Sequence, residues 1–117
     1  MGGKPSAARG EIMGSVKEMV DSSIANNKVM VFSKSYCPFC QRAISALQNL
    51  GIKALEVKQI ENEPNMNEIQ DYLSSLTGGR SVPRVFVGGK FVGGCDETMT
   101  AISNGSLQKM LTDAGAI

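Results

Sequence analysis

The stretch that decides the fold is residues 29–40, Val29-Met30-Val31-Phe32-Ser33-Lys34-Ser35-Tyr36-Cys37-Pro38-Phe39-Cys40. It opens with a short apolar run rich in β-branched residues, which is typical of a buried strand. The two cysteines follow, and Pro38 suits the first helical position, where a backbone N–H would be unpaired anyway. Apolar residues then recur at helical spacing until Gly51, a typical C-terminal stop: Ala43, Ile44, Leu47 and Leu50. The pattern predicts a strand, a Cys-x-x-Cys motif and a helix in immediate succession.

The rest of the chain extends this unit on both sides. The apolar spacing predicts helices at residues 9–26, from Pro64 to Gly78, at 98–102 and at 107–111, a strand at 55–58, and a hairpin with strands 84–87 and 90–92. Early β-α-β alternation requires parallel neighbours, and the late hairpin adds antiparallel ones. We therefore expect one α/β domain over residues 9–117, with a four-stranded mixed sheet flanked by helices on both faces. Residues 1–8 are expected to form a flexible N-terminal leader.

Composition excludes several classes of protein. The 117 residues carry a formal net charge of +1, so no broad field attracts nucleic acid or an acidic membrane. No apolar run approaches the length that spans a bilayer. Histidine is absent, which removes Ser–His and Cys–His hydrolases and most zinc enzymes. Three cysteines are too few for a disulfide scaffold, and they indicate a reducing compartment, the cytoplasm, although a short organelle transit peptide at the N-terminus stays open.

The placement of the two cysteines indicates thiol–disulfide chemistry. Cys37 comes directly before a helix, whose unpaired N–H groups favour a negative charge on its sulfur. Lys34, three residues upstream, can add positive charge, so a thiolate at neutral pH is expected, and disulfide attack requires a thiolate. Cys40 shares the helix face one turn deeper and can attack a mixed disulfide on Cys37. Two structural alternatives are weaker: half of a zinc site, for which Cys95 alone is too few further ligands, and two idle core cysteines.

Three segments carry a resemblance to a known family: Lys34-Ser35-Tyr36-Cys37-Pro38-Phe39-Cys40, Ser81-Val82-Pro83 and Gly93-Gly94-Cys95-Asp96. Together they resemble the dithiol glutaredoxins of the thioredoxin superfamily, in order and at family spacing over about residues 9–115. The resemblance implies the thioredoxin fold, with glutathione as both substrate and reductant. Phe39 stands where many members have Tyr, and Ser81 stands where Thr is frequent. Thioredoxins usually carry Trp-Cys-Gly-Pro-Cys, and this chain has no Trp.

The same resemblance implies a glutathione site. The family places Lys34 and Gln70 near the glycine carboxylate, where Arg80 can assist, and it gives Pro83 a cis peptide bond that leaves the Val82 backbone free to pair with the ligand. Backbone N–H groups at the next helix start suit the γ-glutamyl carboxylate, and an acid there suits its ammonium. The full expected set is Lys34, Cys37, Phe39, Gln70, Arg80, Val82, Pro83, Gly94, Cys95, Asp96 and Glu97. Each has a plainer alternative, such as Asp96 as a helix cap or Cys95 as a packing residue.

We therefore expect a glutathione-dependent thiol–disulfide oxidoreductase that reduces protein disulfides and protein–glutathione mixed disulfides. Cys37 attacks, and Cys40 or glutathione resolves. The expected partners are glutathione and disulfide-bonded or glutathionylated proteins, with no nucleic acid, no membrane and no metal, and the protein is expected to be a monomer. One alternative is a module that binds a [2Fe–2S] cluster through Cys37 and glutathione, against which Pro38 argues within the family. The other is a thioredoxin-type reductase that a flavoenzyme reduces.

Overall fold

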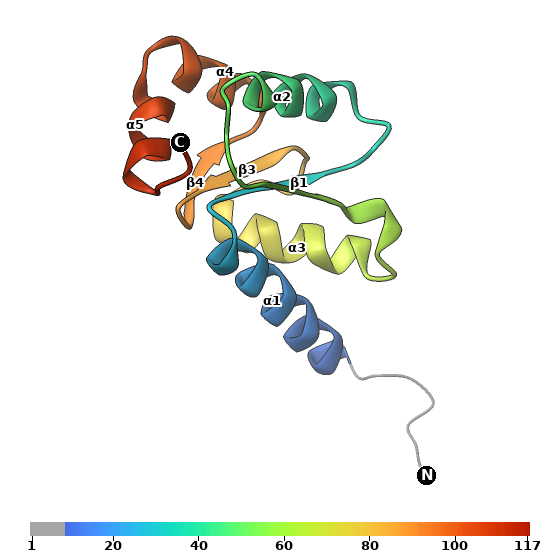
Figure 1. Cartoon of the computed structure of the whole chain (residues 1–117). Coiled ribbons are helices and arrows are strands. Elements are labelled where there is room, and N and C mark those ends of the chain that lie inside the picture. The colour runs from blue at the N-terminus through green and yellow to red at the C-terminus, as the bar shows by residue number, and fades with distance from the viewer. Residues whose placement is uncertain (1–8) are drawn as a thin grey trace.

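A computed structural model gives the structure of the protein and describes residues 9–117, so the predicted leader lies outside the described residues (Figure 1). The elements in chain order are α1 (Arg9–Asn26), β1 (Val29–Ser33), α2 (Pro38–Gln48), β2 (Leu55–Gln59), the short 3-10 helix η1 (Ile60–Asn62), α3 (Met66–Thr77), β3 (Arg84–Val87), β4 (Lys90–Gly93), α4 (Cys95–Ser103) and α5 (Ser106–Asp113). No helix within residues 9–117 is long and apolar enough to cross a membrane.

The four strands form one mixed sheet in the order β2-β1-β3-β4. β1 pairs in parallel with β2 and antiparallel with β3, so Val29 faces Leu55 on one side and Val87 on the other. β3 and β4 form the predicted hairpin, whose turn residues Gly88 and Gly89 have φ of 58° and 82°. This left-handed backbone is the reason why the turn requires glycine. The predicted mixed sheet and the thioredoxin-type arrangement are confirmed.

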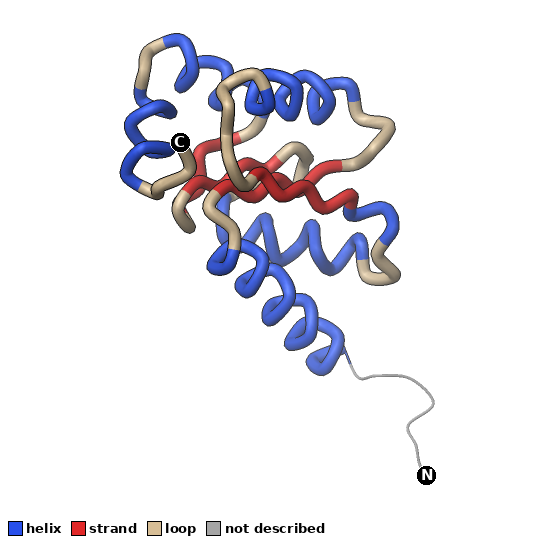
Figure 2. Tube along the Cα trace, viewed as in Figure 1, coloured by secondary structure: helices blue, strands red, loops and turns tan. Residues whose placement is uncertain are grey.

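Helices cover both faces of the sheet, as the sequence predicts (Figures 1 and 2). Along β1, side chains alternate between two apolar clusters because successive residues of a strand point to opposite faces. Met30 and Phe32 pack with Phe86 on the face of the sheet that α1 and α3 cover. Val29 and Val31 pack on the other face, with Leu47 of α2 and Leu107 of α5. β1 is therefore the buried centre of the domain, and its carboxyl end delivers the chain to the Cys37 turn.

Several helix boundaries differ from the prediction: α4 begins at Cys95 instead of near residue 98, and α5 spans Ser106–Asp113 instead of 107–111. α2 ends at Gln48 rather than running to Gly51, and the chain leaves it in tight turns in which the Leu50 N–H donates to the Leu47 carbonyl at 3.0 Å. Leu50 consequently faces outward, with 37% of its surface exposed. α3 begins at Met66, so Pro64 lies in the turn that precedes the helix instead of in its first turn. The predicted stop at Gly78 is confirmed, with φ of 85°.

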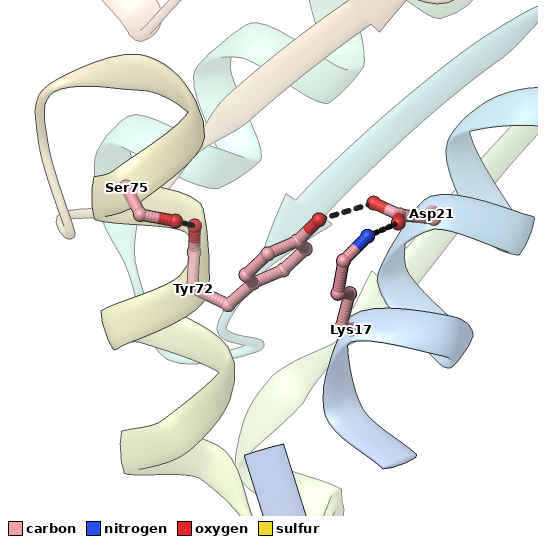
Figure 3. A network of polar contacts seen from close by, with 4 residues as sticks. All are labelled: Lys17, Asp21, Tyr72 and Ser75. Atoms are coloured by element: carbon pink, nitrogen blue, oxygen red, sulfur yellow. Dashed lines mark hydrogen bonds and ion pairs between the residues drawn. The ribbon is translucent and has the colours of Figure 1, made fainter. Parts of the chain in front are cut away.

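A polar network docks α1 on α3 beside the apolar contact (Figure 3). The Tyr72 hydroxyl donates to Asp21 at 2.6 Å, and Lys17 donates to the other oxygen of the same carboxylate at 2.7 Å. These two hydrogen bonds, from Lys17 first and then Tyr72, hold the pKa of Asp21 below its usual value. The carboxylate therefore stays charged at neutral pH, and its contacts fix how α1 lies against α3.

Candidate active site

Cys37 sits at the N-terminus of α2, where it is the N-cap residue and only partly exposed. Its sulfur accepts a hydrogen bond from the Cys40 N–H at 3.2 Å, and Pro38 follows as the first helical residue. The preceding turn closes through a hydrogen bond from the Cys37 N–H to the Lys34 carbonyl at 3.0 Å. The sulfur thus lies at the positive end of a helix, where backbone N–H groups stabilise a negative charge.

Cys40 lies one turn into α2 and, unlike the partly exposed Cys37, is fully buried. Burial, and then the hydrogen bond with Cys37, raises the pKa of Cys40 to about 11. At neutral pH this residue is a neutral thiol next to the exposed sulfur. The pair therefore consists of one accessible thiol and one protected thiol, as the sequence predicts for an attacking and a resolving cysteine.

Alkylation of the reduced protein should separate the three cysteines. At pH 7 a thiol with a pKa of about 11 is ionised in about one molecule in 10,000, so iodoacetamide is expected to modify Cys37 and to spare Cys40. Cys95 should also be spared, because burial raises its pKa as well. Modification of Cys40 should grow as pH rises toward 11. Peptide mass spectrometry measures all three sites, and alkylation in denaturant provides the control in which all three react. Equal labelling of Cys37 and Cys40 at pH 7 would contradict this assignment.

The turn before β3 lies against Cys37. The Val82–Pro83 peptide bond is cis, as the family resemblance implies. The Cys37 sulfur lies 3.8 Å from the Val82 carbonyl oxygen, close enough for a weak S–H···O contact. Pro83 is buried, so this turn is held by the sheet that follows it. The arrangement places a stretch of main chain directly beside the reactive sulfur.

A pocket of about 460 Å³ opens next to this turn. Seven predicted binding residues line it: Phe39, Val82, Pro83, Gly94, Cys95, Asp96 and Glu97. Ser81 and Arg84 line it too, although the sequence analysis did not place them in the site. Their position on either side of Val82-Pro83 was the signal that could have identified them. The pocket therefore has two acidic residues on the α4 side and one guanidinium on the β3 side.

The other four predicted residues, Lys34, Cys37, Gln70 and Arg80, are not among those that line this pocket, although the Cys37 sulfur lies 3.8 Å from the carbonyl oxygen of Val82, which does line it. Gln70 is nearly buried, and its side-chain amide donates to the Arg80 carbonyl at 2.8 Å. The Arg80 guanidinium pairs with Asp71 at 3.3 Å. These contacts order the chain that leads from α3 into the Val82 turn. Lys34 lies in the turn that directly precedes Cys37 in the chain.

Asp96 and Glu97 make different contacts at the start of α4. A Glu97 carboxylate oxygen accepts the Gly94 N–H at 2.8 Å, which is one half of a capping box. Gly93 has φ of 145°, and a Cβ at that position would lie 2.2 Å from the Cβ of Glu97, so only glycine fits under this cap. Asp96 is exposed at the pocket wall. Glu97 therefore supports the helix start, whereas Asp96 is an exposed residue of the pocket lining.

The side chains that could bind a metal ion are dispersed in the described part of the chain. Within residues 9–117, no three side chains of His, Cys, Asp or Glu are grouped so that they could hold a metal ion. Cys95 is 6% exposed at the first position of α4, and burial raises the pKa of its thiol.

Comparisons with known proteins agree with this geometry. The family model described as Glutaredoxin matches residues 29–92. A glutaredoxin of Ricinus communis is 46% identical over 105 residues, which cover 90% of this chain and 98% of the relative. Glutaredoxin-1 of Homo sapiens is 44% identical over 103 residues, covering 86% and 97%. Oxidized glutaredoxin 2 of Chlamydomonas reinhardtii aligns with a TM-score of 0.85 and 45% identity, over 90% of this chain and 98% of that one. A buckwheat glutaredoxin–glutathione complex aligns with a TM-score of 0.89 and 35% identity, over 94% and 99%.

Proposed function

This chain belongs to the glutaredoxin family and is a glutaredoxin oxidoreductase, and from that premise we propose that it uses glutathione to reduce protein–glutathione mixed disulfides and protein disulfides. The observation that carries the proposal is the position of the Cys37 sulfur, 3.8 Å from the Val82 carbonyl and at the N-terminus of α2. The structural relative from buckwheat, a glutaredoxin solved in complex with glutathione, supports glutathione as the ligand.

The proposed reaction of a glutathionylated protein has two steps. The Cys37 thiolate attacks the glutathione sulfur, which forms a disulfide between Cys37 and glutathione and breaks the original one. The protein leaves as a thiolate and takes a proton from water. The thiolate of a second glutathione then attacks the glutathione sulfur held on Cys37, which releases glutathione disulfide and restores the Cys37 thiolate.

A protein disulfide requires the second cysteine. Cys37 attacks one sulfur of the substrate and releases the other as a thiolate. Cys40, whose N–H lies 3.2 Å from the Cys37 sulfur, then loses its proton and attacks that sulfur, so the substrate leaves fully reduced. The resulting Cys37–Cys40 disulfide takes its two electrons from two molecules of glutathione. A neutral, buried Cys40 suits this role because it does not compete for the first attack.

The pocket residues suit the parts of glutathione. The main chain of Val82 can pair with the cysteinyl unit in the manner of an added strand. The N-terminus of α4 suits the γ-glutamyl carboxylate, and Asp96 suits its ammonium. At the other end we assign the glycine carboxylate to Lys34, Gln70 and Arg80. Arg80 is about half exposed in its pair with Asp71, and such surface pairs contribute about 1 kcal/mol or less, so its reorientation toward the ligand has a small cost.

The experiment that tests this function compares two electron donors. The protein should turn over a glutathionylated peptide with glutathione and glutathione reductase. It should turn over poorly with a thioredoxin-reductase-type flavoenzyme and NADPH as the sole source of electrons. Consumption of NADPH measures both reactions. Efficient turnover only in the second system would show that the protein acts as a thioredoxin, and the glutathione site proposed above would then be wrong.

Replacing Asp96 by asparagine should weaken the use of glutathionylated substrates. We expect KM for a glutathionylated peptide to rise about threefold and kcat to stay nearly unchanged, because an exposed charge pair contributes about 1 kcal/mol or less and is similar in the ground and transition states. Glu97→Gln is the matched control, since its amide oxygen can still accept the Gly94 N–H while the charge is removed. A small disulfide without a γ-glutamyl group should be insensitive to Asp96→Asn. Glu97→Gln should behave like the wild type, and if Asp96→Asn raises KM for both substrates equally, Asp96 does not recognise the γ-glutamyl group.

We place this reaction in a reducing compartment, the cytoplasm. A catalytic cycle in which glutathione is the electron donor needs a pool that keeps thiols reduced, and such a pool is typical of the cytosol. Localisation of a tagged full-length chain in cells tests this assignment. Accumulation in an organelle would instead point to the segment before Arg9 as a targeting signal.

A further inference from the structure

The turn that precedes α2 and ends at Cys37 is hydrogen-bonded to Glu61, a residue of η1. Lys34 to Cys37 form a four-residue turn, with Ser35 and Tyr36 exposed at its tip. Every polar group of Ser35 has a partner. Its N–H lies 3.2 Å from both carboxylate oxygens of Glu61, its hydroxyl donates to the same carboxylate, and its carbonyl accepts the side-chain amide of Gln41 at 2.9 Å. An exposed turn next to a reactive sulfur is thereby fixed on two sides.

Glu61 is itself well anchored. It lies in η1, which continues β2, the parallel neighbour of β1. The residue before it, Ile60, is fully buried in the core beneath α1 and α3. The hydrogen bond from the Ser35 hydroxyl is the largest effect that holds the pKa of Glu61 below its usual value, so Glu61 is a carboxylate at neutral pH. Hydrogen bonds to a carboxylate are about twice as strong as neutral ones.

We propose that Glu61 is a positioning residue for the thiol–disulfide reaction, which holds the Lys34–Cys37 turn through Ser35 and so keeps the Cys37 sulfur at the N-terminus of α2. Ser35 and Glu61 are separated by 26 positions in the sequence. Because Glu61 lies in η1, directly after β2, their contact joins the Lys34–Cys37 turn to the sheet and not only to α2. The inference rests on the proposed role of Cys37 as the attacking thiol.

The negative charge of Glu61 disfavours the reaction, whereas its hold on the turn favours it. Whether removal of Glu61 raises or lowers the rate therefore distinguishes the two effects. A carboxylate near Lys34 and near an approaching glutathione repels the thiolate and the carboxylates of the ligand. If Glu61 acted only by its charge, removing it would speed the reaction. If it acts by holding the turn, removing it slows the reaction, because a small displacement of the attacking group has a large effect on rate.

The test compares Glu61→Ala, Glu61→Gln and Ser35→Ala with a control, Glu63→Ala, whose acid instead pairs with Lys58 at 3.6 Å. Two rates are measured: alkylation of Cys37 by iodoacetamide at pH 7, and kcat/KM for a glutathionylated peptide. We expect Glu61→Ala to lower both rates about fivefold, and Glu61→Gln to lower them about twofold because one acceptor oxygen remains.

The variants of Ser35 test the other partner of the same contact. Ser35→Ala should lower both rates, and Ser35→Thr should restore them. The double variant Ser35→Ala/Glu61→Ala should be no slower than Glu61→Ala alone. Glu63→Ala should match the wild type.

Three results would overturn the inference. Equal acceleration in Glu61→Ala and Glu61→Gln that disappears at high salt would show a charge effect only. A lower melting temperature with both rates unchanged would show a purely structural contact. Additive losses in the double variant would show that Ser35 and Glu61 act independently. Absence of selective Cys37 alkylation in the wild type would instead contradict the proposed function, so the two failures are distinguishable.

Discussion

Replacing Cys37 by serine is expected to abolish turnover of every disulfide substrate. Serine keeps the shape of the N-cap and can still accept the Cys40 N–H, so the fold should be preserved. A hydroxyl is not ionised near neutral pH and does not attack sulfur under these conditions. Cys40 cannot substitute for Cys37, because it is fully buried and its pKa is raised to about 11.

The loss should reach at least about a thousandfold in kcat/KM, since Cys40 and Cys95 are both buried and burial raises the pKa of each thiol. The measurement is turnover of a glutathionylated peptide and of a protein disulfide with glutathione as reductant, with the melting temperature as the control for folding. Turnover close to that of the wild type would show that Cys37 is not the attacking residue, and the assignment of the site would be wrong.

Replacing Cys40 by serine should affect the reduction of glutathionylated peptides and the reduction of protein disulfides differently. Reduction of the glutathionylated peptide should persist, because free glutathione can resolve the disulfide on Cys37 without help from Cys40. Reduction of a protein disulfide should fall by at least about tenfold, because an attack from within the molecule is replaced by one that depends on the concentration of glutathione. The buried serine hydroxyl should be tolerated, since polar groups of Lys34 and Ser33 already oppose the rise in the pKa of Cys40.

The ratio of the two activities is the informative quantity for Cys40→Ser. A general defect of folding or thiol reactivity lowers both activities together, whereas loss of a resolving thiol lowers only the second. The control is Cys40→Ala, which removes the hydroxyl as well and should give the same ratio. If both activities fall equally in both variants, Cys40 supports the structure of α2 and does not resolve disulfides.

Local sequence patterns predicted much of the fold because several element boundaries have a local physical cause. Pro38 begins α2, Gly78 ends α3 in a left-handed conformation, and Gly88-Gly89 form the turn of the hairpin. The strict alternation of β1 between two cores follows from a run that is apolar on both faces. The errors have local causes too. Leu50 continues the apolar spacing of α2, yet the helix has already ended, and no residue type marks that earlier end.

Local spacing predicted the parts of the site that are neighbours in sequence, and the family resemblance supplied distant ones such as Val82 and Asp96. The burial of Cys40 behind Cys37 follows from short-range spacing, whereas α4 begins at Cys95, three residues before the helix that the spacing predicted at 98–102. The pairing of Arg80 with Asp71, and the contact of Ser35 with Glu61, depend on where loops meet after folding. Neither contact produces a periodic pattern, so neither the ion pair of Arg80 with Asp71 nor the role of Glu61 was predictable from the sequence. Glu97 was expected at the ligand, and its hydrogen bond to the Gly94 N–H emerged only with the geometry of Gly93.

The central claim is that Cys37 takes glutathione, rather than the protein, from a mixed disulfide. The most direct test incubates reduced Cys40→Ser with one equivalent of a glutathionylated peptide, quenches the mixture with acid, and measures the intact mass followed by peptide mapping. We expect Cys37 to carry one glutathione, Cys95 to be unmodified and the peptide to be released with a free thiol. A Cys37 that carries the peptide while glutathione is released, or an adduct found on Cys95, would contradict it.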